Sequence, residues 1–343
     1  MRGEMNRLVL ILVAIMVCMS CGTKEPKGDN INCSCFERAE ASEENFVGIE
    51  NISFENYPIV DGSTSARALN MMVACKLLNL PYIWFGGGGT GEWSVGTFQE
   101  NIPEEYKDFF VGERIKTSQT HGAFMNLIDG NVDIILTHRT ISPDEKAHAS
   151  AVGVTLIETS IALDAFILIV NKSNRVKSLT VNHVQRIYTG EITNWWQVGG
   201  RRSNIEVVTR PRNSGSEEVF REVVMDGLEP ADFHDVDFLM IHPMWEVLDV
   251  IINNVNSIAY TFYNYKEVIA QRSCSEVPVL AINGICPDEN TVKNRTYPFI
   301  SEVHVAIRSD LDHNSMAYKL YEWLQSEEAK STIVECGFIP KTK

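Results

Sequence analysis

The stretch Pro58-Ile59-Val60-Asp61-Gly62-Ser63-Thr64-Ser65 passes from a short apolar run into a polar turn, and the mostly apolar segment 66–78 follows it. Such an apolar run, a turn of small polar residues and a helix-length segment predict strand, turn and helix, the repeating unit of an α/β protein. Two later runs, 162–170 and 205–208, are nearly all apolar. Strands of that composition are typical of the middle of a sheet covered on both faces. We therefore predict an α/β fold.

Further elements are predicted in both halves of the chain. Segments 112–115 and 302–307 are predicted to be strands, the second because Val303, Val305 and Ile307 alternate with other residues. Segment 315–335 carries apolar residues at helical spacing, with Ser315 as its predicted N-cap and Gly337 just beyond its end. We expect one amphipathic helix there.

The N-terminus has the pattern of an export signal. Arg2 and Arg7 precede the apolar run 8–17, and Ser20 precedes Cys21. The apolar run is too short to span a bilayer, which needs roughly 20 apolar residues in a helix. We expect residues 1–20 to be a signal peptide and the protein to be exported.

Residues 21–50 are polar and lack apolar periodicity, which is typical of a flexible tether. The sequence Met19-Ser20-Cys21-Gly22 resembles the lipobox of bacterial lipoproteins, although Cys18 stands where an aliphatic residue is usual. The resemblance implies that Cys21 is acylated and that the lipid anchors the protein to a membrane, on its periplasmic or extracellular face. A signal that is cleaved without lipidation is the alternative.

Charge and cysteine content narrow the function classes. The formal net charge of −15 argues against nucleic-acid binding and against long-range attraction of an anion. The cysteines show no metal-ligand spacing, so we expect no metal and no cofactor. A disulfide between Cys274 and Cys286 is one option in an oxidising compartment, while Cys75 and Cys336 have the pattern of buried thiols.

Three polar turns each lie between a predicted strand and a predicted helix, at 61–65, 117–122 and 210–216. Hydroxyl and backbone N–H donors at a helix start suit an anion, although capping of the helix explains each turn by itself. The third turn adds Arg210, whose guanidinium matches a tetrahedral oxyanion, close to the small residues Ser214-Gly215-Ser216. Together the three turns predict an oxyanion held between two parts of the chain.

Longer stretches of the chain resemble the phosphate-binding proteins of ABC importers, a branch of the type 2 periplasmic binding proteins. The stretch Tyr188-Thr189-Gly190-Glu191-Ile192-Thr193-Asn194-Trp195 is the most specific. The other stretches that carry the resemblance are Asp61 to Ser65, Gly130 to Glu145, Asp164 to Asn174, Arg210 to Phe220 and the C-terminal run Ser326 to Pro340.

The resemblance implies two α/β lobes joined by crossing strands, with the ligand in the cleft between them. Lobe one would hold residues 51–160 and 261–343, and lobe two residues 161–260. It implies a monomer that captures phosphate and delivers it to an ABC permease. The positions that match phosphate-contacting residues of the family are Thr64, Ser65 through its backbone, Thr120, Arg210, Ser214, Gly215 and Ser216.

Three positions depart from the family pattern. His138 stands where many members have an aspartate that accepts the proton of phosphate, and Asp61 or Asp164 are the candidates to replace it. Arg212 stands where an acidic residue is common, and Ser216 where threonine is usual. These departures leave sulfate, molybdate and tungstate open as alternative ligands.

Two other classes of function stay open. A phosphatase would fit a phosphate site with histidines such as His121 and His138 nearby, but Ser214 lacks a base at a recognisable spacing. A receptor that signals to a membrane sensor would carry the same ligand site as an importer's binding protein. The sequence favours a binding protein without catalysis.

Overall fold

The computed structural model describes the chain from Phe46 to Lys341 with gaps. The described residues are 46–85, 94–212, 214–231, 238–240, 244, 246–266 and 276–341. They belong to one compact unit. The predicted signal peptide 1–20, the lipidation site Cys21, most of the tether 21–50 and Cys274 lie outside the described residues.

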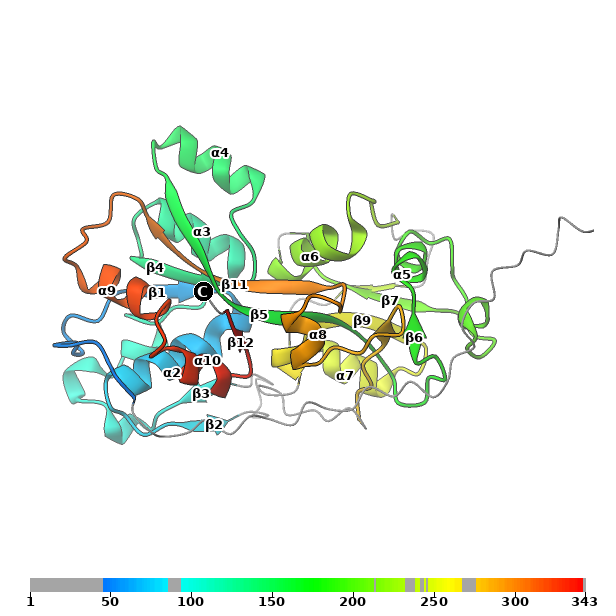
Figure 1. The fold of residues 1–343 in the computed structure, drawn as a ribbon, viewed down its shortest axis with the longest axis horizontal. Helices are drawn as coiled ribbons and strands as arrows, with labels where there is room; N and C mark the ends of the chain where they lie inside the picture. Colours follow the sequence, from blue (N-terminus) through cyan, green and yellow to red (C-terminus); the bar gives the residue numbers. More distant parts are fainter. Residues whose placement is uncertain are drawn as a thin grey trace, which may run out of the picture. The chain divides into compact units, whose positions relative to one another are not determined.

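The described chain alternates between helices and strands (Figure 1). The α-helices are α2 (Arg67–Leu77), α3 (Gln119–Ile128), α4 (Pro143–Ala151), α5 (Val181–Tyr188), α6 (Gly215–Val219), α7 (Glu246–Asn253), α8 (Glu289–Lys293), α9 (Met316–Trp323) and α10 (Lys330–Glu335). The strands are β1 (Val60–Gly62), β2 (Ile83–Phe85), β3 (Ser94–Gly96), β4 (Ile134–Thr137), β5 (Leu156–Val170), β6 (Ser178–Leu179), β7 (Glu206–Thr209), β8 (Phe238–Met240), β9 (Ser257–Phe262), β10 (Ala281–Ile282), β11 (Ile300–Arg308) and β12 (Ile339–Pro340).

The first strand, turn and helix form as predicted. Strand β1 leads into the 3-10 turn η1 (Thr64–Ala66), and α2 follows directly. The Ser63 hydroxyl caps this turn by accepting the backbone N–H of Ala66. Gly62 is required because a β-carbon there would lie 2.5 Å from the carbonyl oxygen of Leu136 on the neighbouring strand β4.

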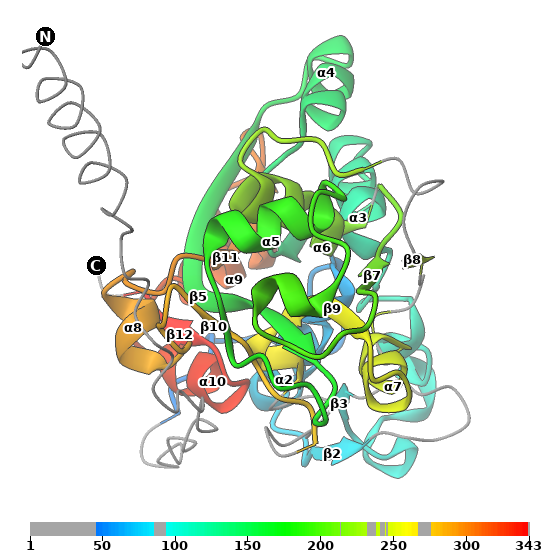
Figure 2. The same cartoon turned by 90° about the vertical axis from the view of Figure 1, so that its right-hand side faces the viewer.

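The main sheet has the strand order β1-β4-β11-β5-β9-β7-β8, with β12 paired to β5. Strands β1 and β4 are parallel to each other, as are β9, β7 and β8. Strands β11 and β5 run antiparallel to their neighbours. Helices α6 and α7 lie on opposite faces of the β9–β7 strands, so this part of the sheet is covered on both sides (Figures 1 and 2).

Strand β5 joins the two ends of the sheet. Its residues 156–165 pair with β11, and its residues 166–170 pair with β9. Figure 1 shows β5 and β11 side by side between the two groups of elements. The long apolar run at 162–170 therefore forms the central strand that its composition predicts.

Two large apolar cores lie at the two ends of this strand. The lobe-one core includes Leu69 and Val305. The lobe-two core includes Trp195, Phe220 and Leu280.

The segment 277–299 contributes Val277, Leu280 and Phe299 to the lobe-two core. The sequence had placed 261–343 in lobe one. Because apolar packing defines a lobe, we propose that the chain returns to lobe one near Ile300, where β11 begins.

Two predicted elements differ from the structure. At 112–115 the structure has no strand: Gly112 is left-handed with φ 118°, and Ile115 makes an isolated bridge to Val60. The single helix predicted at 315–335 is wrong, because the structure has α9 and α10 with a turn between them. The Ser326 hydroxyl donates to the carbonyl oxygen of Trp323 at 2.7 Å, which ends α9.

Cys75, Cys286 and Cys336 are the cysteines of the described part. Cys75 and Cys336 are buried thiols, as predicted. Cys286 takes part in a disulfide.

Candidate functional site

Two of the three predicted turns meet directly. Thr120 lies in the first turn of α3, and Gly215 is the first residue of α6. A β-carbon at Gly215 would lie 2.0 Å from the Thr120 hydroxyl oxygen, so these two helix starts are in contact. The sequence placed the two turns in different lobes, and the fold brings them together.

The turn after β1 contacts the end of β4. The Ser65 hydroxyl oxygen lies 2.7 Å from Nδ1 of His138, and 3.1 Å from the hydroxyl oxygen of Ser63. Nε2 of His138 lies 3.7 Å from Oδ2 of Asp164 on β5. Ser65, His138 and Asp164 are each only 3% exposed. Thr64 is half-buried in the same turn.

Asp164 is a buried carboxyl group with a perturbed pKa. Burial raises the pKa of Asp164, because a low-polarity environment disfavours the charge. His138 opposes this shift, and so do the backbone N–H groups of Asn264 and Ala165, which donate to Oδ1 at 3.2 Å and 2.8 Å.

Asp61 has a structural role. It is fully buried, and Oδ1 accepts the backbone N–H groups of Gly62 and Ser118, both at 2.8 Å. Oδ2 accepts the side-chain N–H of Asn126 at 2.8 Å. Asp61 thus ties the turn after β1 to the start of α3. Both oxygens are occupied, so the geometry favours Asp164 over Asp61 as the acidic group of the site.

Arg210 follows β7 and carries a cation into the interior. Its backbone N–H donates to the Tyr260 hydroxyl oxygen at 3.1 Å. Its side-chain Nε is buried and has no hydrogen-bond partner among the described residues. Burial lowers the pKa of the Arg210 guanidinium, because charge is disfavoured there. Arg212, the second cation of this turn, is exposed.

Ser214 and Ser216 are buried at the start of α6. The Ser214 hydroxyl accepts the backbone N–H of Glu217 at 3.2 Å, and its oxygen lies 3.4 Å from the Ser216 hydroxyl oxygen. Glu217 accepts a hydrogen bond from the Tyr260 hydroxyl. Tyr260 therefore connects the Arg210 turn to α6.

An ion-pair cluster that the sequence does not predict lies at the same place. Arg139 follows β4 and makes a two-pronged pair with the buried Glu145, with both N–O distances at 2.8 Å. Its Nε also pairs with Glu218 of α6. Nδ1 of His121, on α3, lies 2.9 Å from Oε1 of Glu145. No periodicity links Arg139 to Glu218, so a single sequence carries no signal for this contact.

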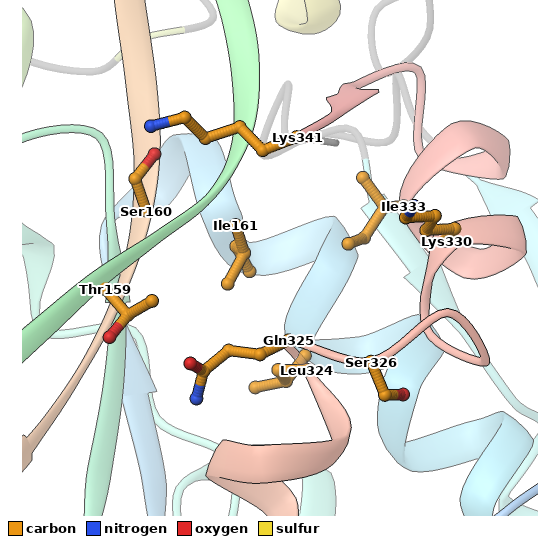
Figure 3. Close-up of a pocket in the computed structure, with 9 residues that line it drawn as sticks. All are labelled: Thr159, Ser160, Ile161, Leu324, Gln325, Ser326, Lys330, Ile333 and Lys341. Carbon is orange, nitrogen blue, oxygen red and sulfur yellow. The ribbon is translucent and has the colours of Figure 1, made fainter. Parts of the chain in front are cut away.

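A separate pocket of 190 Å³ lies away from these residues (Figure 3). It is lined by Thr159, Ser160, Ile161, Leu324, Gln325, Ser326, Lys330, Ile333 and Lys341. Its two lysines already pair with carboxylates: Lys341 with Glu302 at 2.9 Å and Lys330 with Glu327 at 2.6 Å. None of the predicted site residues lines it.

The described residues show neither a membrane-spanning helix nor a metal-binding cluster. No helix in these residues has the length and apolar content needed to cross a bilayer. Within the same residues, no cluster of His, Cys, Asp and Glu has the arrangement of a metal site.

Sequence comparisons identify related proteins. A family model described as a PBP superfamily domain matches residues 104–328. The phosphate-binding protein PstS of Bacillus subtilis is 27% identical over 188 residues, which are 54% of this chain and 58% of that protein. The chain thus spans little more than half of that relative. PstS of Staphylococcus epidermidis is 24% identical over 263 residues, covering 74% of this chain and 78% of that protein.

Solved structures show the same fold. A phosphate ABC-transporter substrate-binding protein from Clostridium perfringens, solved with bound phosphate, has a TM-score of 0.60 at 22% identity and covers 85% of this chain and 99% of that chain. A phosphate transport receptor from Vibrio cholerae has a TM-score of 0.55 at 23% identity, covering 84% and 99%. These likenesses confirm the predicted two-lobed α/β fold with crossing strands.

Proposed function

This chain belongs to the PBP superfamily, and on that premise we propose that it binds inorganic phosphate outside the cytoplasmic membrane and delivers it to an ABC permease. The PstS names of the relatives support phosphate as the ligand. His138, which contacts the Ser65 hydroxyl, belongs to the proposed site. The proposed contacts to the anion are Thr64, Ser65, Thr120, Arg210, Ser214, Gly215 and Ser216.

The observation that carries this proposal is the half-buried side chain of Arg210, whose Nε is enclosed. A buried guanidinium is stable only with a counter-charge or hydrogen-bond acceptors, because removing it from water is costly. Nε of Arg210 has no acceptor among the described residues. A bound oxyanion would supply both the charge and the acceptors.

Ligand binding is proposed to work by closure of the lobes. The Thr120–Gly215 contact and the Arg139–Glu218 ion pair join the start of α3 and the segment after β4 to helix α6. Contacts that exist only when the lobes meet favour the closed state, and an anion that touches both lobes adds to them. The ligand therefore shifts the population towards the closed form, which the permease would recognise.

We propose binding without turnover. Ser65, His138 and Asp164 are residue types found in hydrolases, but here they lie in a nearly inaccessible cluster. A chromogenic phosphoester should therefore not be hydrolysed. Turnover that is lost on changing His138→Ala would contradict this part of the proposal.

The location is also a proposal. We propose that the protein acts as a monomer on the outer side of the cytoplasmic membrane, held by a lipid on Cys21. One acyl chain gives only marginal membrane binding, so a stable anchor requires the further acyl chains that lipoproteins carry.

Isothermal titration with phosphate, sulfate, molybdate and tungstate, after dialysis against anion-free buffer, tests the proposal. Phosphate is expected to bind most tightly. Tight binding of one of the other anions, with no binding of phosphate, would contradict phosphate as the ligand. The fold and the proposed site would be unaffected by that result.

A further inference from the structure

Lobe one fixes the guanidinium of Arg139 by itself. Its two terminal nitrogens pair with the two oxygens of Glu145 at 2.8 Å, and one of them also donates to the carbonyl oxygen of Thr140 at 2.8 Å. The guanidinium carbon lies 5.0 Å from the centroid of the Phe124 ring. Glu145 is fully buried, and its Oε2 also accepts the backbone N–H of Ser142 at 2.9 Å. The cation is therefore held in one orientation, whatever the position of lobe two.

The remaining edge of the Arg139 guanidinium faces lobe two. Its Nε forms an ion pair with Glu218 of helix α6. Val219, the next residue along the chain, packs in the lobe-two core. The contact of Gly215 with the Thr120 hydroxyl places the start of α6 at the same boundary. Arg139 therefore pairs with one carboxylate from each lobe.

Closure of the lobes removes only one of the two charges of the Arg139–Glu218 pair from water. Because Arg139 is already paired with Glu145, most of the cost of burying it is compensated within lobe one. Glu218 loses water when the lobes meet, although its side chain is still 24% exposed. This burial raises the pKa of Glu218, and Arg139 opposes the shift. A fixed cation and a partly desolvated carboxylate thus attract the two lobes to each other.

We propose that Glu218 is an affinity-determining residue, because its pair with Arg139 keeps the two lobes closed on the bound anion. This inference rests on the proposed function. Glu218 is a positioning residue that acts through the arrangement of the lobes, and it is not one of the proposed contacts to the anion. Its charge alone has the opposite effect, since a carboxylate in the first turn of α6 repels an anion held at the start of that helix. The direction in which affinity changes when the charge is removed distinguishes the two effects.

The variant Glu218→Gln tests the proposal, because glutamine keeps the size of the side chain and removes its charge. Titration calorimetry and stopped-flow fluorescence with inorganic phosphate measure the affinity and the release rate of the full chain in detergent. We expect phosphate to bind about fivefold or more weakly, the lower end of the usual coupling between two sites. The loss should come mainly from faster release. Unchanged or tighter binding would overturn the inference.

Glu222→Gln is the matched control. Glu222 lies in the π-helical turn η6 (Phe220–Met225), which continues α6, and its side chain is exposed. This variant removes the same charge from the same lobe without touching Arg139, so its affinity should change no more than about twofold. Equal losses in the two variants would show that charge in general, and not the pair with Arg139, sets the affinity, and would overturn the inference.

Hydrogen exchange provides a readout that needs no ligand. Exchange is measured by mass spectrometry over the helix starts 118–122 and 214–219, whose amides become more accessible when the lobes separate. If the wild-type protein binds no phosphate, the proposed function fails, and this measurement still tests the pair. We then expect faster exchange of both helix starts in Glu218→Gln than in wild type, and equal rates would overturn the inference.

Discussion

The Thr120 hydroxyl occupies the space that a side chain at Gly215 would need, since a β-carbon there would lie 2.0 Å from its oxygen. Thr120 lies in the first turn of α3 and Gly215 is the first residue of α6, so the two helix starts are in direct contact. Glycine at this position thus permits the contact between the two lobes.

Changing Gly215→Ala should weaken phosphate binding about tenfold or more, because the added methyl group opposes closure and lowers the population of the competent state. Stability should change little, since alanine is favourable in a helix. Titration calorimetry and thermal unfolding measure the two effects. Gly48→Ala is the control, because a β-carbon at Gly48 makes only ordinary contacts at 3.5 Å and 3.7 Å. Full affinity in Gly215→Ala would show that closure does not need this approach.

Removing the half-buried cation of Arg210 should cost most of the affinity. Arg210→Ala is expected to lose about 2–5 kcal/mol of binding free energy, the range for one member of a buried charge pair. Arg212→Ala is the matched control in the same turn. Arg212 is exposed, so its removal should cost less than about 1 kcal/mol. Equal effects of the two changes in titrations with phosphate would remove Arg210 from the site.

Glu302 should make stability depend on pH in the acid range. Burial alone would raise the pKa of Glu302, but hydrogen bonds from Ser160, Arg295 and Lys341 lower it from 4.5 to about 2. The native state therefore favours the ionised form. The stabilisation that ionised Glu302 gives to the native state is fully present above its usual pKa of 4.5. It is lost as the pH falls towards about 2.

Glu302→Gln should accordingly lower the free energy of unfolding at neutral pH, and its difference from wild type should shrink as the pH falls. Urea unfolding at several pH values measures this. Glu327→Gln is the control, because Glu327 pairs with Lys330 but its side chain is 76% exposed. If the difference in the free energy of unfolding between Glu302→Gln and wild type stayed constant down to acid pH, the lowered pKa of Glu302 would be contradicted.

Cys21→Ser should release the protein from membranes. Membrane and soluble fractions of cells that express the two forms give the distribution, and Cys33→Ser serves as the control within the tether. Membrane retention of Cys21→Ser would argue against the lipid anchor.

The sequence by itself was enough where neighbouring residues decide the structure. The strand, turn and helix at 58–78 follow from an apolar run, the Ser63 cap and helix formers that are adjacent in the chain. The apolar composition of 162–170 likewise predicts a buried strand, whichever strands pair with it. Where a local signal is overruled by another nearby residue, as at Gly112 or Ser326, the prediction was wrong.

Only the tertiary structure decided which distant side chains meet. Asp61 and Asp164 are both aspartates close to predicted strands, but Asp61 is enclosed by donors of its own turn and α3, while Asp164 faces His138. The pair of Arg139 with Glu218 depends in the same way on how α6 sits against the end of β4. Such contacts join residues far apart in the chain, so no periodicity or capping pattern encodes them, and the packing of the two lobes around β5 determines them.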